Sequence, residues 1–533
     1  MQPRGMDLTG SLMGGRLSLT PRPVRSRAPV LEAAMLGHLP GRVRLDRLRG
    51  AARESMRAAG FGEALDHLEP MARPRLSPAE IARVRALEHL PVPLLSSAEL
   101  DDIFPDARAS EDTGHRSLLA GARAWLPQAV DDYFANGGER LWLLRIPVTE
   151  GRDGFLPRSV DAPAPGVLVL EHSLKLRGLA ALLVIPDLAV IAAPDLERLL
   201  IPARLPDVPR LRLDNPVPLF APCGSVVDDG HRERRRPDEV PDPAEPDATL
   251  ALIERIQSVL GRHRPDIQYL HSLPLVYSGA AGGPAANDRV LAALAARRGR
   301  PEGAGLKRVQ FLFPYLRGPR FPLGSPVGLV AGRQAGVARR EGVWRSMAGQ
   351  ALVTDATPYP LVGSRAAERL RDHPGVGVLA RRRGRVELED ERLVVPALHP
   401  DDYLGALEPA RFDGYRAGEV ARFIGYLLRR LRALGEVLVF DLAPRDPRPR
   451  LLLEDLFRAL HAAGALRGAL PQEAFSIREG QRAEGLLAYD IELAPAFPLD
   501  RLRLTFINRD GEWQAGLLGQ VPGSGSASGV VRG

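Results

Sequence analysis

The sequence is poor in cysteine, lysine, aromatic residues and long apolar runs, and each shortage excludes a class of protein. Cys223 is the only cysteine in 533 residues, which excludes a scaffold held together by internal disulfides. Pro186 and Asp187 interrupt the most apolar stretch, 179–193, which is too short for the roughly 20 residues of a membrane-spanning helix. Residues 1–27 lack the apolar core of a secretory signal. We therefore expect a chain that assembles in the cytoplasm and does not insert directly into a membrane.

The basic side chains are almost all arginine, because Lys175 and Lys307 are the only lysines. This bias is typical of a GC-rich genome, so the formal net charge of +7 is weak evidence for a nucleic-acid partner. A surface that binds nucleic acid also needs aromatic rings that stack on bases. Aromatic residues make up 5% of the chain, and the densest basic runs, 232–236 and 381–385, contain none. We expect both runs to be solvated and expect no nucleic acid among the partners.

Helices that precede short apolar strands dominate the middle of the chain. Residues 114–134 predict an amphipathic helix, kinked at Pro127 and ended by Asn136-Gly137-Gly138, and an apolar strand follows at 141–146. Strands that are apolar on both faces are typical of a parallel sheet covered by helices. Two further α/β units are predicted. The second lies at 179–195, with apolar runs 182–185 and 190–193, and the third has helix 248–262 and strand 267–270 and repeats in strand 309–313.

Three segments depart from this α/β pattern. Residues 1–30 are rich in Gly, Pro and Arg and predict an N-terminal arm with one strand-like piece at 16–20. Residues 41–90 predict a helical insertion, in which residues 77–80 form a capping box at the start of a helix. Residues 228–247 combine acidic residues, arginines and prolines without an apolar period, and we expect a mobile loop there.

The chain is predicted to divide into an α/β domain at 31–350 and a C-terminal domain at 351–510. Residues 511–533 have the composition of a flexible tail. The C-terminal domain is expected to contain helices 417–434 and 452–463, ended by Gly435 and Gly464, and strands at 437–442, 488–493 and 501–507.

The motifs that carry common chemistries are incomplete. The glycines of 278–284 lack the Lys and the Ser or Thr of a phosphate-binding loop. Residues 375–380 match a dinucleotide-binding pattern, but His373-Pro374 precedes them and a run of arginines follows. The eleven histidines and Cys223 show no zinc-binding spacing, and no nucleophile elbow is present. The acidic doublets suit helix starts or solvent: Asp101-Asp102, Asp131-Asp132, Asp228-Asp229 and Asp401-Asp402. We expect no catalytic, cofactor-binding or metal-binding residues and no cofactor.

Several segments, taken in chain order, resemble the tail sheath proteins of contractile phage tails and bacterial contractile injection systems. Residues 133–145 are close to the family's FFANGG motif with its basic residue and apolar strand. Residues 464–475 are similar to the family's GALxGATPEEAF run. The resemblance covers about residues 91–510 and includes further matches at 91–104, 183–187, 312–316, 326–332, 341–344, 373–378 and 422–440. The family's usual PGVYxEE arm is absent from this sequence.

This resemblance implies a mixed sheet with covering helices, a C-terminal α+β sheath domain and extended terminal arms. It implies a structural subunit, not an enzyme, that polymerises around an inner tube and contracts to drive the tube through a target envelope. The expected partners are further copies of the chain, joined by strand exchange of arms at 10–24 and 501–520, the inner tube protein, and baseplate and cap proteins. The expected location is a virion tail or a contractile injection particle. Two alternatives remain open: a divergent minor sheath copy at the baseplate or cap, and an α/β enzyme of unknown substrate.

Overall fold

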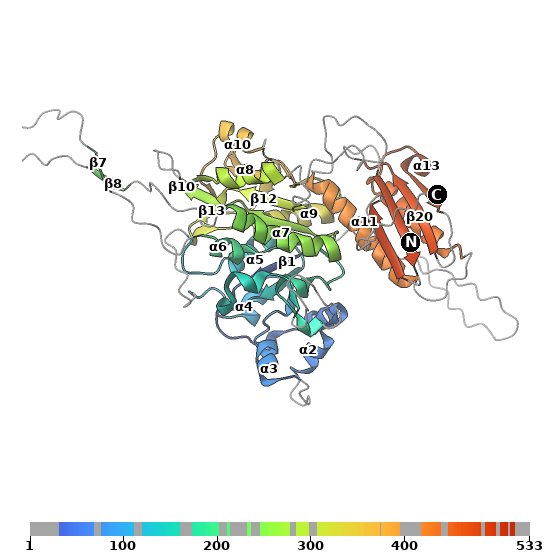
Figure 1. Ribbon diagram of the computed structural model, residues 1–533, viewed down its shortest axis with the longest axis horizontal. Coiled ribbons are helices and arrows are strands. Elements are labelled where there is room, and N and C mark those ends of the chain that lie inside the picture. Colours follow the sequence, from blue (N-terminus) through green and yellow to red (C-terminus); the bar gives the residue numbers. More distant parts are fainter. Residues whose placement is uncertain are drawn as a thin grey trace, which may run out of the picture.

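Two β-sheets joined by a long helix organise the protein (Figure 1). The computed structural model describes residues 31–68, 76–110, 120–159, 173–201, 210–213, 232–235, 246–277, 284–297, 306, 308–371, 373, 375–394, 417–438, 446–480, 486–496, 502–509 and 512–517. The predicted mixed sheet with covering helices and the C-terminal α+β unit are both confirmed.

The main sheet has nine strands, and the six from β17 to β3 run parallel. The three outer strands β2, β18 and β15 run antiparallel to their neighbours. Every residue of the central strands β1, β6, β9 and β12 is buried, as the runs of apolar residues in the last three predict. In sheet order the strands are β15 (Ala351–Leu352), β18 (Arg385–Leu388), β17 (Val376–Arg382), β12 (Val309–Phe313), β9 (Gln268–Ser272), β6 (Leu188–Ala192), β1 (Glu32–Gly37), β3 (Leu141–Arg145) and β2 (Pro91–Leu94).

Helices α5 (Leu126–Ala135) and α9 (Val327–Glu341) pack tightly against each other and contact β1. Glycines on α9 allow this close approach. A Cβ atom at Gly328 would lie 2.3 Å from the carbonyl oxygen of Ala129, and one at Gly332 would lie 2.2 Å from that of Tyr133. The other helices of this unit are α4 (Ser97–Ile103), α6 (Pro194–Leu199), α7 (Pro246–His263), α8 (Asp288–Arg297) and α10 (Ser364–Arg371).

The C-terminal unit is a four-stranded antiparallel sheet whose strands follow chain order. Its aromatic core includes Phe506 stacked on Trp513 at 4.3 Å and Phe457 against Phe475 at 5.6 Å between ring centroids. The strands are β19 (Phe475–Glu479), β20 (Leu486–Leu493), β21 (Leu502–Arg509) and β22 (Glu512–Leu517), and the helices are α11 (Gly418–Val437), α12 (Arg448–Ala462) and α13 (Pro471–Ala474).

Smaller elements surround the main sheet. The predicted helical insertion is helical at 50–66 and 78–85, and Ser77 and Glu80 form the predicted capping box. Its helices are α1 (Gly50–Met56), α2 (Gly62–Asp66) and α3 (Pro78–Arg85). The minor strands are β4 (Arg158–Ser159) with β5 (Leu176–Arg177), β7 (Arg210–Leu213) with β8 (Arg232–Arg235), β10 (Leu275–Tyr277) with β11 (Pro284–Ala286), and the sheet β14 (Phe321–Gly324), β13 (Tyr315–Gly318), β16 (Thr357–Tyr359).

Several predicted helix and strand limits are wrong. Helix α5 begins at Leu126, so Pro127 lies in its first turn, where a missing N–H costs nothing, and makes no kink. Residues 178–182 form a 3-10 helix, and 182–185 lead into a turn before β6. Gly435 lies inside α11, which continues to Val437, the residue predicted to start a strand.

The predicted domain limits also need correction. Strands β17 and β18 lie beyond residue 350 but belong to the main sheet, so the C-terminal unit begins after 394. The predicted arm at 501–520 contains β21, which pairs on both sides within its own sheet. Strand β22 shows that the tail predicted at 511–533 includes an ordered strand.

Part of the predicted mobile loop 228–247 is ordered, because β8 pairs with β7 and α7 begins at Pro246. Several other predictions lie outside the described residues. They are the N-terminal arm at 1–30 with its segments 10–24 and 16–20, Cys223, the glycine-rich run 278–283, and the strand predicted to continue through 439–442.

Candidate assembly interface

One edge of the main sheet is β2, and prolines close it to further strand pairing. Pro91 and Pro93 alternate along β2 opposite Leu144 and Trp142 of β3. Proline has no backbone N–H, and within sheets it is confined mainly to edge strands. Since the two prolines occupy alternate positions, the outer side of β2 lacks the donors that another strand would need.

The opposite edge of the main sheet is β15, and the side chain of Asn136 closes it. Asn136 Oδ1 accepts a hydrogen bond from the N–H of Val353 at 2.8 Å, and Asn136 Nδ2 donates to the carbonyl of Val353 at 3.0 Å. This pair of bonds imitates a neighbouring strand at the residue that follows β15. With only two residues in β15, little of this edge remains for pairing.

The Asn136-Gly137-Gly138 sequence thus has a structural explanation at each position. Gly137 has a φ of +104°, which a residue with a side chain rarely adopts. A Cβ atom at Gly138 would lie 2.1 Å from the ring of Tyr133. The N–H of Gly138 donates to the carbonyl of Tyr133 at 3.1 Å, which ends α5 as the sequence predicts.

The residues that follow anchor β3 to the start of β1. Glu32, the first residue of β1, accepts hydrogen bonds from Arg140 Nη1 and from Trp142 Nε1, both at 2.9 Å. Burial raises the pKa of Glu32, and these two donors oppose the rise. The 133–145 segment therefore serves helix termination, edge closure and strand pairing.

The C-terminal sheet ends at β19 and β22, each of which has a strand on one side only within the described residues. Helix α11 packs on β22, so β19 is the edge considered for strand pairing. Ala474, the residue before β19, accepts a hydrogen bond from the N–H of Ala494 at 2.8 Å, so the backbone of Ala474 faces β20. A second bond from Gly480 N to Ala488 O at 2.8 Å continues the same alternation. By this alternation the N–H of Ile477 points away from β20, along the outer edge.

Helix α11 connects this sheet rigidly to the main sheet through a buried carboxylate at its N-terminal end. Arg422 of α11 donates to Glu391 at 2.5 and 3.1 Å. Glu391 also accepts bonds from Gln334 at 3.0 Å and from Ser346 and the N–H of Met347, each at 2.8 Å. Burial alone would raise the pKa of Glu391, but the charge and hydrogen bonds of Arg422 hold it below its usual range.

A second buried carboxylate holds the middle of α11. Asp266 accepts bonds from Arg264 at 2.9 Å and from Arg432 of α11 at 3.0 Å, while Arg429 donates to its backbone carbonyl at 3.0 Å. Burial opposes ionisation of Asp266, but the surrounding arginines lower its pKa. Towards its C-terminal end α11 packs on β22, where Gly435 allows Trp513 to approach.

The carboxyl ends of the parallel strands, where open α/β sheets usually bind ligands, hold a polar cluster that is closed to solvent. Glu197 accepts a bond from the N–H of Ser272 at 2.8 Å, and His271 Nδ1 lies 3.7 Å from Glu197 Oε1. Glu197 and His271 are 0% exposed and Ser272 is 1% exposed. Burial raises the pKa of Glu197 to about 7 and lowers that of His271 to about 3. These three groups are therefore shielded from solvent in the described structure.

The dinucleotide-like pattern at 375–380 runs into and along β17, with no strand-to-helix turn, so it lacks the geometry that binds a pyrophosphate. Among the described residues no group of three or more His, Cys, Asp or Glu is arranged to hold a metal ion. Within the same residues, no helix combines the length and apolar character needed to cross a membrane.

Comparison with solved structures identifies the fold. A chain from the baseplate of the anti-feeding prophage in its contracted state aligns with a TM-score of 0.53 at 14% identity, covering 93% of this chain and 97% of that one. The contracted helical sheath of the same prophage gives 0.50 at 13%, with the same coverage. A sheath tail protein from Desulfitobacterium hafniense gives 0.46 at 8%, covering 90% and 96%.

No protein-family model matches the sequence, and no curated protein matches it. The likeness therefore lies in the fold and extends over nearly the whole chain. The protein has the fold of the sheath proteins of contractile injection systems, as the resemblance of its motifs implies.

Proposed function

We propose that the chain is a structural subunit of a contractile sheath. The observation that carries this proposal is the contrast between the closed edges of the main sheet and the open edge β19 of the C-terminal sheet. An open edge can pair with an extended segment of another copy through backbone hydrogen bonds. Contacts between unlike surfaces of successive copies produce an open helix where the rotation does not close. Such a helix would surround an inner tube and, on contraction, drive it through a target envelope.

In this proposal the chain catalyses no reaction, and the energy of contraction is stored in the extended lattice. Its partners are other copies of the chain, an inner tube protein, and baseplate and cap proteins. Its location is a contractile particle assembled in the cytoplasm, either a phage tail or an injection system. The fold match to a helical sheath and the burial of Glu197, His271 and Ser272 support this assignment over an α/β enzyme.

Electron microscopy of the purified chain tests the proposal. We expect rings or helical tubes at raised protein concentration, and no hydrolysis of ATP or saturable binding of NAD. A protein that remains monomeric across salt and concentration series, or that binds either nucleotide at micromolar concentration, would contradict a sheath role.

The fold match to a baseplate chain favours a second candidate, a minor sheath copy at the baseplate or cap. Gold labelling of the chain in intact particles separates the two. Label along the whole length indicates the main sheath subunit, whereas label confined to one end indicates the minor copy.

A further inference from the structure

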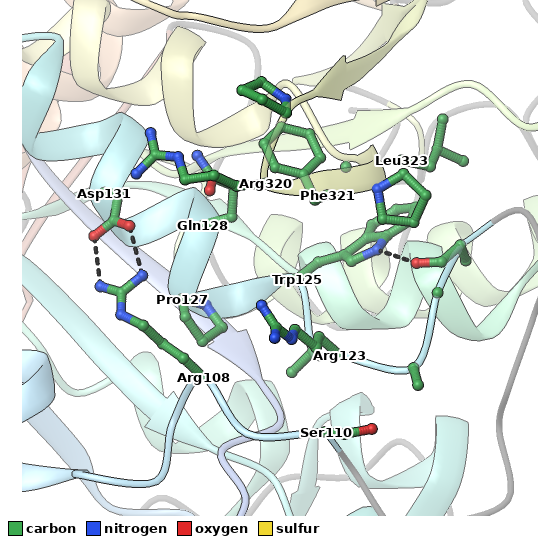
Figure 2. A pocket seen from close by; sticks show the side chains of 17 residues that line it. Arg108, Ser110, Arg123, Trp125, Pro127, Gln128, Asp131, Arg320, Phe321 and Leu323 are labelled. Atoms are coloured by element: carbon green, nitrogen blue, oxygen red, sulfur yellow. Dashed lines mark hydrogen bonds and ion pairs between the residues drawn. The ribbon is translucent and has the colours of Figure 1, made fainter.

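A groove between α5 and the β13–β14 hairpin lies outside the sheet edges and has no role in the fold (Figure 2). Its volume is about 920 Å³. Its floor is apolar and includes the buried residues Trp125, Pro127 and Leu323. Trp125 is held in place because its Nε1 donates to the carbonyl of Ala120 at 3.2 Å. The groove therefore has a fixed floor that an apolar side chain can cover.

The rim of the groove is positively charged. Arg108 is neutralised by Asp131 at 2.6 Å and by Asp101 at 2.9 Å. Among the described residues, the ion pair of Arg320 is a solvent-exposed one with Asp355 at 3.3 Å, a kind of contact that contributes little stability.

Arg123 is exposed on the same rim, and within the described part of the chain no ion pair involves it. Figure 2 shows Arg123 and Arg320 on either side of Trp125. The groove therefore offers two cationic side chains beside an apolar floor, a composition common at the energetic centre of protein interfaces.

The complementary chemistry is an exposed apolar side chain next to an available carboxylate, and the first turn of α13 with its N-cap residue Leu470 supplies it. Leu470 is 58% exposed, and Glu473 follows three residues later, where it accepts a hydrogen bond from the N–H of Ala469 at 2.8 Å. Leu451 of α12 is also exposed, but the carboxylate beside it, Glu454, already binds Arg450 and Arg458. Of these two segments, charge complementarity favours the one from Leu470 to Glu473.

Building on the proposed sheath function, we propose that the groove receives the Leu470–Glu473 turn of a second copy of this chain. In Figure 1 the α13 turn lies in the C-terminal unit, and α5 and β13 lie in the main unit. The two surfaces differ, so their contact is head-to-tail and can repeat without closing, as a helical sheath requires. Leu470 would cover the apolar floor, and Glu473 would pair with Arg123 and Arg320.

Charge exchange tests this contact, with the critical concentration for assembly as the readout. Arg123→Glu and Glu473→Arg should each raise that concentration at least about tenfold, the equivalent of about 1.4 kcal/mol. The double variant should restore assembly towards the wild-type value. Arg381→Glu, at an exposed arginine outside the groove, is the matched control and should change nothing. Thermal unfolding of each variant checks that the subunit is folded.

The possible outcomes separate this contact from the sheath function itself. If the wild type forms tubes and Arg123→Glu has the wild-type critical concentration, the groove contact is wrong. The proposed sheath function is not contradicted by that result. Loss of assembly in both single variants without rescue in the double variant would overturn the pairing with the Leu470–Glu473 turn. A wild-type chain that forms no tubes or rings would overturn the sheath function and this contact with it.

Discussion

At the scale of the residue, the end of α5 shows what a short motif does and how much of it a sequence can reveal. The sequence predicts that Asn136-Gly137-Gly138 ends a helix, and the positive φ of Gly137 confirms this. The contact of Asn136 with Val353 was not predictable, because 217 residues separate the two. The local sequence predicts backbone conformation well. It does not predict which backbone group, distant in the sequence, a side chain contacts in the fold.

Replacing Gly137 and Gly138 together by valine should destabilise the fold. Valine resists a positive φ, which costs on the order of 1–2 kcal/mol, and a Cβ at position 138 would overlap the ring of Tyr133. We expect a lower midpoint of thermal unfolding and less soluble protein. Gly261→Ala is the control, since nothing lies near a Cβ atom there. An unchanged midpoint in the double variant would mean that the helix end tolerates side chains.

A second residue-scale feature is the buried carboxyl of Asp132. It accepts one bond from Gln128 at 3.0 Å, and its second oxygen has no hydrogen-bond partner in the described structure. Burial raises the pKa of Asp132 from 3.8 to about 8. Because the folded pKa lies above the unfolded one, folding stability is retained below about pH 4 and is lost as the pH rises towards 8.

Asp132→Asn should therefore reduce the pH dependence of stability. The variant keeps an acceptor for Gln128 but cannot ionise, so we expect its unfolding midpoint to exceed that of the wild type at pH 8.5 and to differ less at pH 5. Glu197, with a pKa near 7, leaves a residual decline in both proteins. Asp102→Asn, at an exposed carboxylate on α4, is the control. If the unfolding midpoints of wild type and Asp132→Asn changed in parallel with pH, Asp132 would ionise at its ordinary pKa.

At the scale of the element, the sequence analysis predicts no strand at β1 and misplaces the end of α11. Strand β1 has the sequence Glu-Ala-Ala-Met-Leu-Gly, whose residues favour helices, yet it occupies the middle of the main sheet. Burial between β3 and β6 overrides this local preference. Gly435 was predicted to end α11, but it serves the close approach of Trp513. A glycine required for packing cannot be distinguished locally from one required for a turn.

Removing one partner of the buried pair between Glu391 and Arg422 should weaken the attachment of α11. Arg422→Met leaves Glu391 buried without its cation, and such losses cost about 3–5 kcal/mol. We expect a lower urea midpoint and earlier proteolysis near α11. Replacing both residues by leucine should recover part of the stability, since no unpaired charge remains. Equal stability of Arg422→Met and wild type would contradict the role given to this pair.

The open edge of β19 leads to a prediction about assembly. Ile477→Pro removes an N–H that points away from β20, whereas Ile477→Ala removes the same apolar contacts and keeps the N–H. Both variants should show a similar small loss in thermal stability. Only the proline variant should fail to form tubes in electron micrographs. Tubes of normal length from Ile477→Pro would exclude strand pairing at this edge.

At the scale of the whole molecule, the sequence predicts the architecture better than it predicts the boundaries between the domains. The parallel sheet, the helical insertion and the C-terminal unit were all expected from patterns and motif order. The boundary at 351 was misplaced because β17 and β18 return to the main sheet after α10. The candidate assembly surfaces were predicted only in outline, since edge accessibility depends on which strands become neighbours.

The corrected place of β21 changes the expected effect of C-terminal truncation. Deleting residues 502–533 removes β21 and β22, leaves β20 with one neighbour and uncovers its buried face, so the C-terminal unit should unfold and the product should aggregate. Deleting only 518–533 retains all four strands and should leave the unfolding midpoint unchanged. Circular dichroism and size-exclusion chromatography distinguish the two products. A soluble, cooperatively folded 1–501 fragment would show that β21 is dispensable.

If the chain has the proposed sheath function, helix α11 has a mechanical consequence for it. Its 20 residues span about 30 Å, and two buried carboxylates bind its first three quarters to the main unit, while its last turn packs on β22. A force applied to the C-terminal sheet would therefore pass along α11, which is attached to the main unit at Glu391 and at Asp266. The compliance of an assembled tube would then reside in the connections between subunits, and each subunit would turn as one stiff body.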